Sequence, residues 1–304
     1  MAQRIRVPGL VDLVLVADPS EIRALNEEPR LDRRFLPRGP LVNRLIAGRI
    51  RRWFQIQGQP LPSLAARGDQ VRAERQRELE IALDPASGRA LWSEQQLDKL
   101  ASFVRGAGTH ESTAITVQET AITVQEIAGR LFDPLYAADP ESWRAATLID
   151  RFREGFSPVQ IIWLITGRLR RARALLVERA KQNRWAMHAT AIGVHGIVAA
   201  LERMRQLRAL PDATSLGDDA VLGRCLAPPK QVPRTVEASL ASPFVAGEMQ
   251  PGALVMLKLD AADPSTPGAE TVFMQGHWNG CPAWAFVTAL LQSVWHRSLR
   301  EGGP

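Results

Sequence analysis

The sequence is poor in cysteine, in lysine and in long apolar runs. Cys225 and Cys281 are its only cysteines in 304 residues, too few for the disulfide framework of a secreted protein of this size. No apolar run approaches the roughly 20 residues that a membrane-spanning helix needs. The segment from Met1 to Pro8 lacks the apolar core and the cleavage site of a signal peptide. These absences predict a cytoplasmic protein with reduced thiols and no membrane span.

The formal net charge of +6 comes almost entirely from arginine, since lysine occurs only at Lys99, Lys181, Lys230 and Lys258. An arginine-rich surface can attract nucleic acid, anionic lipid or an acidic partner. Acidic residues are interspersed along the chain, which favours an ordinary solvated surface, and no nucleic-acid partner is expected. Hydrophobic residues make up 45% and charged residues 23%, as in ordinary globular proteins. Because the composition shows no break, a single domain over residues 1–304 is predicted.

Local signals predict a mainly helical chain with small β elements. Val11 to Ala17 predicts a short strand, after which Asp18 can cap a helix that begins at Pro19. Ser93 and Gln96 form the pattern of a capping box before the next apolar run. Further helices are expected at about 143–152, 159–181, 183–207 and 282–297, and the best strand at 253–259.

The two long helices in the middle of the chain differ in character. The first, from about Val159 to Lys181, carries several arginines that form either a solvated face or a docking face for an acidic partner or a substrate carboxylate. These are Arg168, Arg170, Arg171, Arg173 and Arg179.

The second long helix has one apolar stripe, at Thr190, Val194, Ile197, Leu201 and Met204, which faces the core. Gly193 and Gly196 lie in its middle, where each glycine costs about 1 kcal/mol relative to alanine. Either a flat ligand or a closely packed helix is expected against these glycines.

A seven-residue segment is duplicated in tandem: Thr113 to Glu119 recurs as Thr120 to Glu126. Seven residues are nearly two helical turns, so the duplication rotates a helix face by only about 20°. The repeat therefore predicts a lengthened helix rather than a solenoid, which would need a longer period and more copies.

The most informative segment runs from Phe273 through Cys281 to Ala283. Cys281 stands directly before Pro282, which suits the first position of a helix. Helix N-termini lower the pKa of a nearby thiol and so stabilise a thiolate. Gly276 and Gly280 allow a tight loop with room for a planar ligand. By itself, a cysteine before a helix is a weak signal, and a buried, inert thiol is the more common outcome.

This segment resembles the ligand loop of the cytochrome P450 family, in which Phe273, Gly276, His277, Cys281 and Ala283 match in kind. The match departs at two points. The spacing from phenylalanine to cysteine is one residue longer than usual, and Ala283 replaces a glycine.

The resemblance extends upstream of the ligand loop. Arg224 is similar to the arginine of the family's Glu-x-x-Arg motif, but Val221 stands at the glutamate position. Pro233-Arg234-Thr235 resembles the segment whose arginine pairs with a haem propionate. The resemblance implies a shortened cytochrome P450-like fold that binds haem b, with Cys281 as the iron ligand. Arg234, His277, Gly276 and Gly193 are then candidate haem contacts, although Arg234 and His277 are also compatible with ordinary surface positions.

In oxygen-activating members of the family, the long helix over the haem carries an acid followed by threonine, which relay protons. The corresponding positions here are His195 and Gly196, so ordinary monooxygenase chemistry is in doubt. Because the pKa of histidine lies near neutral pH, His195 is a candidate acid–base for peroxide chemistry. A packed or solvent-facing histidine is the alternative.

Three functions remain open at this point. The first is a haem-thiolate oxidoreductase that acts on a small apolar substrate, such as a fatty acid or lipid hydroperoxide, through peroxide chemistry. The second is a conventional monooxygenase with a separate acidic redox partner. The third is a non-catalytic haem-binding relative, which the loss of the glutamate at Val221 would fit.

Overall fold

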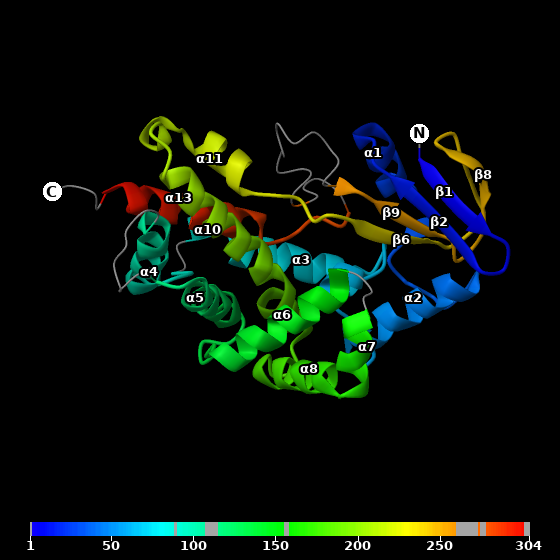
Figure 1. Cartoon of the computed structure of the whole chain (residues 1–304), viewed down its shortest axis with the longest axis horizontal. Coiled ribbons are helices and arrows are strands. Elements are labelled where there is room, and N and C mark those ends of the chain that lie inside the picture. Colours follow the sequence, from blue (N-terminus) through cyan, green and yellow to red (C-terminus); the bar gives the residue numbers. More distant parts are fainter. Residues whose placement is uncertain are drawn as a thin grey trace. The chain divides into compact units, whose positions relative to one another are not determined.

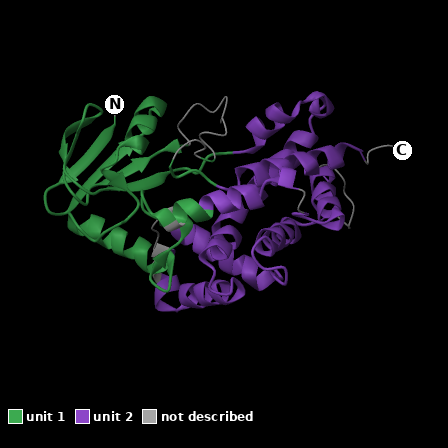
Figure 2. Cartoon of the chain, turned by 180° about the vertical axis from the view of Figure 1, so that it is seen from behind, with its two compact units in different colours: residues 1–75, 227–281 green, residues 76–226, 282–304 purple. Residues whose placement is uncertain are grey.

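The computed structural model describes residues 2–87, 90–106, 115–154, 158–259, 273 and 278–300. The chain forms two compact units, each built from two separate stretches (Figure 2). Unit 1 contains Met1–Arg75 and Ala227–Cys281, and unit 2 contains Gln76–Leu226 and Pro282–Pro304. The single domain predicted over residues 1–304 stays a prediction.

Unit 1 is built on a five-stranded sheet with the order β1-β2-β9-β6-β3 (Figure 1). Its strands are β1 (Gln3–Val7), β2 (Val11–Val16), β3 (Leu31–Asp32), β6 (Val232–Val236) and β9 (Leu254–Leu257). Only the β2–β9 pair is parallel, with Val14 opposite Val255. Alternate residues of β2 are buried, as expected for a strand with one covered face. The strands predicted at 11–17 and 253–259 are therefore confirmed.

The other elements of unit 1 surround this sheet. They are α1 (Pro19–Glu27), α2 (Leu41–Trp53), the short strands β4 (Gln55–Ile56) and β5 (Gln59–Pro60), the 3-10 turn η1 (Pro62–Leu64), the start of α3 (Gln70–Ala82), and the hairpin of β7 (Leu240–Ser242) and β8 (Val245–Met249). The predicted Asp18 cap is present, because its carboxylate accepts hydrogen bonds from the N–H groups of Ser20 and Glu21. Helices α2 and α3 were not predicted.

Unit 2 is helical. Its elements are η2 (Pro85–Ser87), α4 (Glu94–Arg105), α5 (Val117–Arg130), α6 (Pro140–Glu154), α7 (Pro158–Ile165), α8 (Arg168–Arg179), α9 (Arg184–His188), the π-helical turn η3 (Ala189–Gly193), α10 (Val194–Arg208), η4 (Ala213–Ser215), α11 (Asp218–Cys225) and α13 (Trp284–Arg300). The prediction of a mainly helical chain with small sheets is confirmed. No described helix is both long and apolar enough to cross a membrane.

The two long helices differ from their predictions. The first breaks into α7 and α8 at Gly167, whose φ of 67° lies in the left-handed region that glycine adopts readily. The second runs through α9, η3 and α10 with a π-helical insertion in the middle. The predicted stripe of Thr190, Val194, Ile197, Leu201 and Met204 is buried throughout.

The two copies of the tandem repeat serve different purposes, so the lengthened helix is only partly observed. Thr116 of the first copy caps α5 in a capping box with Glu119, and the helix begins at Val117. Thr123, the equivalent of Thr116 in the second copy, lies inside the helix and donates a hydrogen bond to the Glu119 carbonyl. Thr113 and Ala114 lie outside the described residues.

Candidate functional site

The loop that ends at Cys281 is closed by a backbone hydrogen bond. The N–H of Cys281 donates to the carbonyl of Phe273 at 2.8 Å, and Cys281 is partly buried. Helix α13 begins at Trp284, so Pro282 and Ala283 precede it rather than opening it. Two of the predicted haem contacts, Gly276 and His277, lie outside the described residues.

The residues just before Cys281 are anchored to α1 and α3. The indole N–H of Trp278 donates to the Asn26 carbonyl at 3.0 Å. The Asn26 amide donates to the side chain of Asn279 at 3.2 Å, and the Arg72 guanidinium donates to the Trp278 carbonyl at 2.8 Å. These bonds fix the approach of the chain to Cys281.

Arginine side chains gather around the Trp278 ring. The guanidinium carbons of Arg33, Arg67 and Arg234 lie 4.6, 4.8 and 5.5 Å from the ring centroid, within the range of cation–π attraction. With Arg72, these residues form what we call the arginine cluster. Arg33, Arg72 and Arg234 are buried, so the cluster places several positive charges together away from water.

Asp32, a buried carboxylate whose charge acts on Arg33 and Arg234, is already engaged. Its oxygens accept the backbone N–H groups of Arg33 and Arg67 and pair with Arg34. Burial, reinforced by Arg67 and Arg72 and opposed by Asp32, lowers the pKa of Arg234 to about 9. Burial, together with Arg234 and Arg72, also holds the pKa of Arg33 well below its usual value.

Two donors of the cluster lack hydrogen-bond partners in the described structure. The Nε atoms of Arg67 and Arg234 are buried and unbonded, whereas the terminal nitrogens of Arg234 donate to the Pro233 carbonyl and to Asn26 Oδ1. Buried donors of this kind normally have acceptors. The cluster therefore fits a ligand that carries carboxylates, as a haem does through its two propionates.

Sequence reasoning found only Arg234 of this cluster. Arg33, Arg67 and Arg72 were missed because they lie in a part of the chain, residues 30–90, that the sequence did not place. Trp278 lies in the predicted ligand loop, but no role was predicted for it. One signal was available: no aspartate or glutamate occurs between Arg33 and Gly68, although the segment is rich in arginine. A basic stretch without acids inside a folded unit indicates a site for an anion or a surface for one.

In unit 2, Gly193 and Gly196 leave one side of the long helix open. Both are exposed. A Cβ at Gly193 would meet only the His188 carbonyl, at 3.8 Å, and a Cβ at Gly196 would meet nothing within 4 Å. Close helix packing, the alternative sequence interpretation, is therefore not seen at these residues. The open side suits approach of a flat ligand.

His195, which lies between these glycines in the sequence, packs on α6. Its ring centroid lies 4.7 Å from that of Trp143. Burial lowers its pKa, opposed by Asp150 and by backbone carbonyls, so the neutral imidazole predominates near neutral pH. Its Nε2 atom is buried without a hydrogen-bond partner in the described structure.

The π-helical turn on this helix is held by buried side chains. The Gln125 amide donates to the carbonyls of Thr190 and Ser142, at 3.0 and 3.3 Å, and the Ser142 hydroxyl donates back to Gln125. The Thr190 hydroxyl is itself committed to the Ala186 carbonyl at 2.8 Å. π-Helical turns are frequent at functional sites.

The remaining motif residues offer little chemistry. Val221 is buried and Arg224 is exposed on α11, so this helix offers no acid–arginine pair. Burial raises the pKa of Cys225 to about 11, which makes its thiol inert at neutral pH. Neither cysteine is in a disulfide, and Cys281 is the better candidate for a metal ligand.

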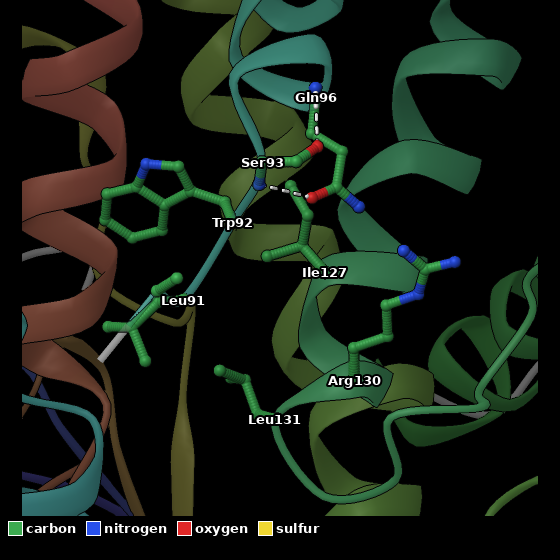
Figure 3. Close-up of a pocket in the computed structure, with 8 residues that line it drawn as sticks. Leu91, Trp92, Ser93, Gln96, Ile127, Arg130 and Leu131 are labelled. Carbon is green, nitrogen blue, oxygen red and sulfur yellow. Dashed lines mark hydrogen bonds between the residues drawn. The ribbon is translucent and has the colours of Figure 1, made fainter.

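A surface hollow in unit 2 lies beside the capping box of α4, where Ser93 and Gln96 bond as predicted (Figure 3). Its walls include Trp92, Ile127 and the aliphatic part of Arg130. None of the predicted site residues lines this hollow, and it is not the candidate site.

The described residues form a mainly helical chain with small sheets, in which the residues before Cys281 lie next to the arginine cluster. Comparison with solved structures shows that the chain has the cytochrome P450 fold. It is similar to the myxobacterial cytochrome P450 CYP267B1 in complex with myristic acid, with a TM-score of 0.62 and 16% identity over 98% of this chain and 84% of that one.

Two further structures show the same fold. CYP175A1 from Thermus thermophilus matches with a TM-score of 0.59 and 14% identity over 98% of this chain and 83% of that one. The tirandamycin C-bound P450 monooxygenase TamI matches with a TM-score of 0.58 and 16% identity over 97% and 85%. No family model matches the sequence, and no curated protein matches it.

Proposed function

We propose that this protein is a haem-thiolate oxidoreductase in which Cys281 ligates the iron of haem b. The observation that carries the proposal is the arginine cluster next to the loop that ends at Cys281. Within unit 1, Arg72 bonds the carbonyl of Trp278, and Trp278 lies three residues before Cys281. The arginine cluster that would hold the propionates therefore also contains the residue that bonds the loop of the thiolate ligand.

The residues of unit 1 divide the work of binding. The Nε atoms of Arg67 and Arg234 have no hydrogen-bond acceptor in the described structure, and a propionate carboxylate would supply one. Trp278 offers its ring to three of the guanidinium groups, and Asn26 bonds both Trp278 and Arg234. Bound haem with a thiolate ligand supplies oxidation chemistry, since the thiolate pushes electron density to the iron and favours O–O cleavage.

Peroxide is the oxidant that we favour. Residues 186–200 contain no aspartate or glutamate. The hydroxyl of their single threonine, Thr190, donates a hydrogen bond to the Ala186 carbonyl. This helix therefore offers no acid–threonine relay for delivering protons, and peroxides need less proton delivery than O2. His195 enters the proposal as the candidate proton acceptor, with a neutral ring and an unbonded Nε2.

We further propose a small apolar substrate of the fatty-acid or lipid hydroperoxide class. A similar protein, CYP267B1, was solved in complex with myristic acid, which supports this class. A site that relies on reduced Cys281 fits the cytoplasm, where thiols stay reduced.

A conventional monooxygenase is the second candidate. The observation in its favour is the exposed basic face of α8, where Arg168, Arg170 and Arg171 point to solvent. A face of this kind can dock an acidic electron-transfer protein.

Turnover of a hydroperoxy fatty acid separates the candidates. The haem-loaded protein is assayed without NAD(P)H, and in parallel with the parent fatty acid plus NADPH, a ferredoxin and its reductase. Activity in the first assay supports the peroxide proposal. Activity only in the second overturns it in favour of the monooxygenase. Haem binding without either activity indicates a non-catalytic relative.

A further inference from the structure

One end of unit 1 exposes large aliphatic side chains next to arginines. The turn between β1 and β2 is made by Val7, Pro8, Gly9 and Leu10, all of which are exposed. Val7 is 46% exposed and Leu10 is 45% exposed. The turn is closed by a hydrogen bond from the Leu10 N–H to the Val7 carbonyl at 3.0 Å, so these side chains lie at a chain reversal (Figure 1).

The start of α2 lies directly beside this turn. The N–H groups of Leu41 and Val42 donate to the carbonyls of Gly9 and Leu10 at 3.0 and 2.9 Å. N–H groups in the first turn of α2, which have no acceptor within the helix, thus donate to the β1–β2 hairpin and hold the two elements together.

The orientation of α2 is fixed by Asn43. Its amide donates to the carbonyls of Asp12 and Gly252 at 2.7 and 2.9 Å. The face that carries Asn43 and Ala47 is buried. Leu41 and Leu45 lie on the opposite face, and they are 46% and 65% exposed.

Exposed leucine and valine side chains are therefore contiguous across the turn and the helix. We call Val7, Leu10, Leu41 and Leu45 the aliphatic patch. Connected aliphatic surface rimmed by polar residues can mark a site for a protein or membrane partner.

The exposed charged residues next in sequence to the members of the aliphatic patch are basic. Arg6, Arg38 and Arg44 are exposed beside it, and the stretch from Arg33 to Gly68 contains no acidic residue. The even spread of acids noted for the whole chain does not hold here. Asp12, the acid nearest in sequence to the turn, is buried and paired with Arg4 at 2.8 Å.

We propose that this end of unit 1 binds the surface of an anionic lipid bilayer. Aliphatic side chains at a turn and on a helix face can enter the boundary between headgroups and acyl chains, while adjacent arginines pair with lipid phosphates. An acidic protein is the less fitting occupant, because protein interfaces concentrate their energy in aromatic residues and the patch has none. The proposal does not depend on the haem site.

The test is co-sedimentation of the purified full-length protein with vesicles. One set contains phosphatidylglycerol in phosphatidylcholine, and the other contains phosphatidylcholine alone. We expect binding to the anionic set only, weakened as salt rises from about 0.1 M to about 1 M because the Debye length falls from ~10 to ~3 Å. Equal binding to both sets, or none to the anionic set, overturns the proposal.

Variants locate the binding surface. The double variant Leu41→Ser/Leu45→Ser should lower the partition coefficient by about 30-fold, and Arg44→Gln by about five-fold. Matched controls are Leu135→Ser, a leucine that is 83% exposed in unit 2, and Arg77→Gln, an exposed arginine flanked by Glu74 and Glu78 on α3. Neither control should change binding.

Two results would contradict the assignment. One is wild-type binding by the double variant with an unchanged far-ultraviolet circular dichroism spectrum. The other is failure to bind vesicles together with Arg44-dependent binding to polyglutamate, which would assign the surface to an acidic protein.

Discussion

Replacing Arg234 with methionine should change stability and haem affinity in opposite directions. Arg234 is fully buried, and Arg33, Arg67 and Arg72 surround it with like charge. Exchanging a poorly compensated buried ion for an apolar side chain of similar size is often stabilising by about 1–4 kcal/mol. The lost bonds to Asn26 Oδ1 and to the Pro233 carbonyl together offset about 1–2 kcal/mol of this. The haem-free variant should therefore gain roughly 1 kcal/mol of unfolding free energy.

Haem affinity should fall in the same variant. A charge-assisted hydrogen bond to a propionate is worth about 1.5–3 kcal/mol, so the dissociation constant should rise about ten- to hundred-fold. The stability is measured by urea unfolding of the haem-free protein, and the affinity by absorbance titration with haem.

The pH dependence gives a further check. Arg234 has a pKa of about 9 in the folded protein, below its value in the unfolded chain. The unfolded chain thus binds more protons above this pH, and the wild type gains stability as pH rises from about 9. The advantage of Arg234→Met should be constant below pH 9 and shrink above it.

Arg4→Met is the matched control, because Arg4 is a half-buried arginine of the same sheet whose guanidinium nitrogens are all hydrogen-bonded. It bonds both oxygens of Asp12, at 2.9 and 2.8 Å. Breaking this pair leaves a buried carboxylate alone and should destabilise the protein by about 3 kcal/mol, without changing haem affinity. A destabilised Arg234→Met variant with unchanged haem affinity would refute the assignment of the cluster.

Two other predictions concern unit 2 and its contrast with unit 1. Gly129→Ala should destabilise the protein by about 3 kcal/mol, because the added Cβ would overlap the buried Tyr136 ring. Gly48→Ala, whose Cβ would meet nothing within 4 Å, should raise the unfolding free energy by up to about 1 kcal/mol. Equal thermal shifts for the two variants would count against the packing around Gly129. His195→Phe keeps an aromatic ring against Trp143 but removes the proton acceptor. Peroxide-dependent turnover should therefore fall about 100-fold, while the haem spectrum stays unchanged. Full turnover by this variant would show that His195 has no part in the mechanism.

The sequence predicted the elements whose signals are local. Asp18 and Ser93 cap their helices as expected, because capping depends on residues within one turn. The stripe from Thr190 to Met204 is buried because its spacing matches the helical period. The break at Gly167 was missed, since a glycine inside an arginine-rich helical segment does not reveal its positive φ.

The arginine cluster depends on contacts that are distant in sequence. Arg67 and Arg234 meet at Trp278 only because β6 pairs beside β9 and β3 in the sheet. No periodicity connects these residues. Only Arg234 was predicted, and it was predicted from resemblance to a family segment rather than from spacing.

The most direct test of the central claim is the absorption spectrum of the haem-loaded, reduced, CO-bound protein. We expect a Soret band at the position typical of a thiolate ligand. Cys225→Ala should keep this band, because the Cys225 thiol is buried with its pKa raised to about 11. Cys281→Ser should lose it. A thiolate-type Soret band retained in Cys281→Ser, or absent from the wild type with haem bound, would contradict the account.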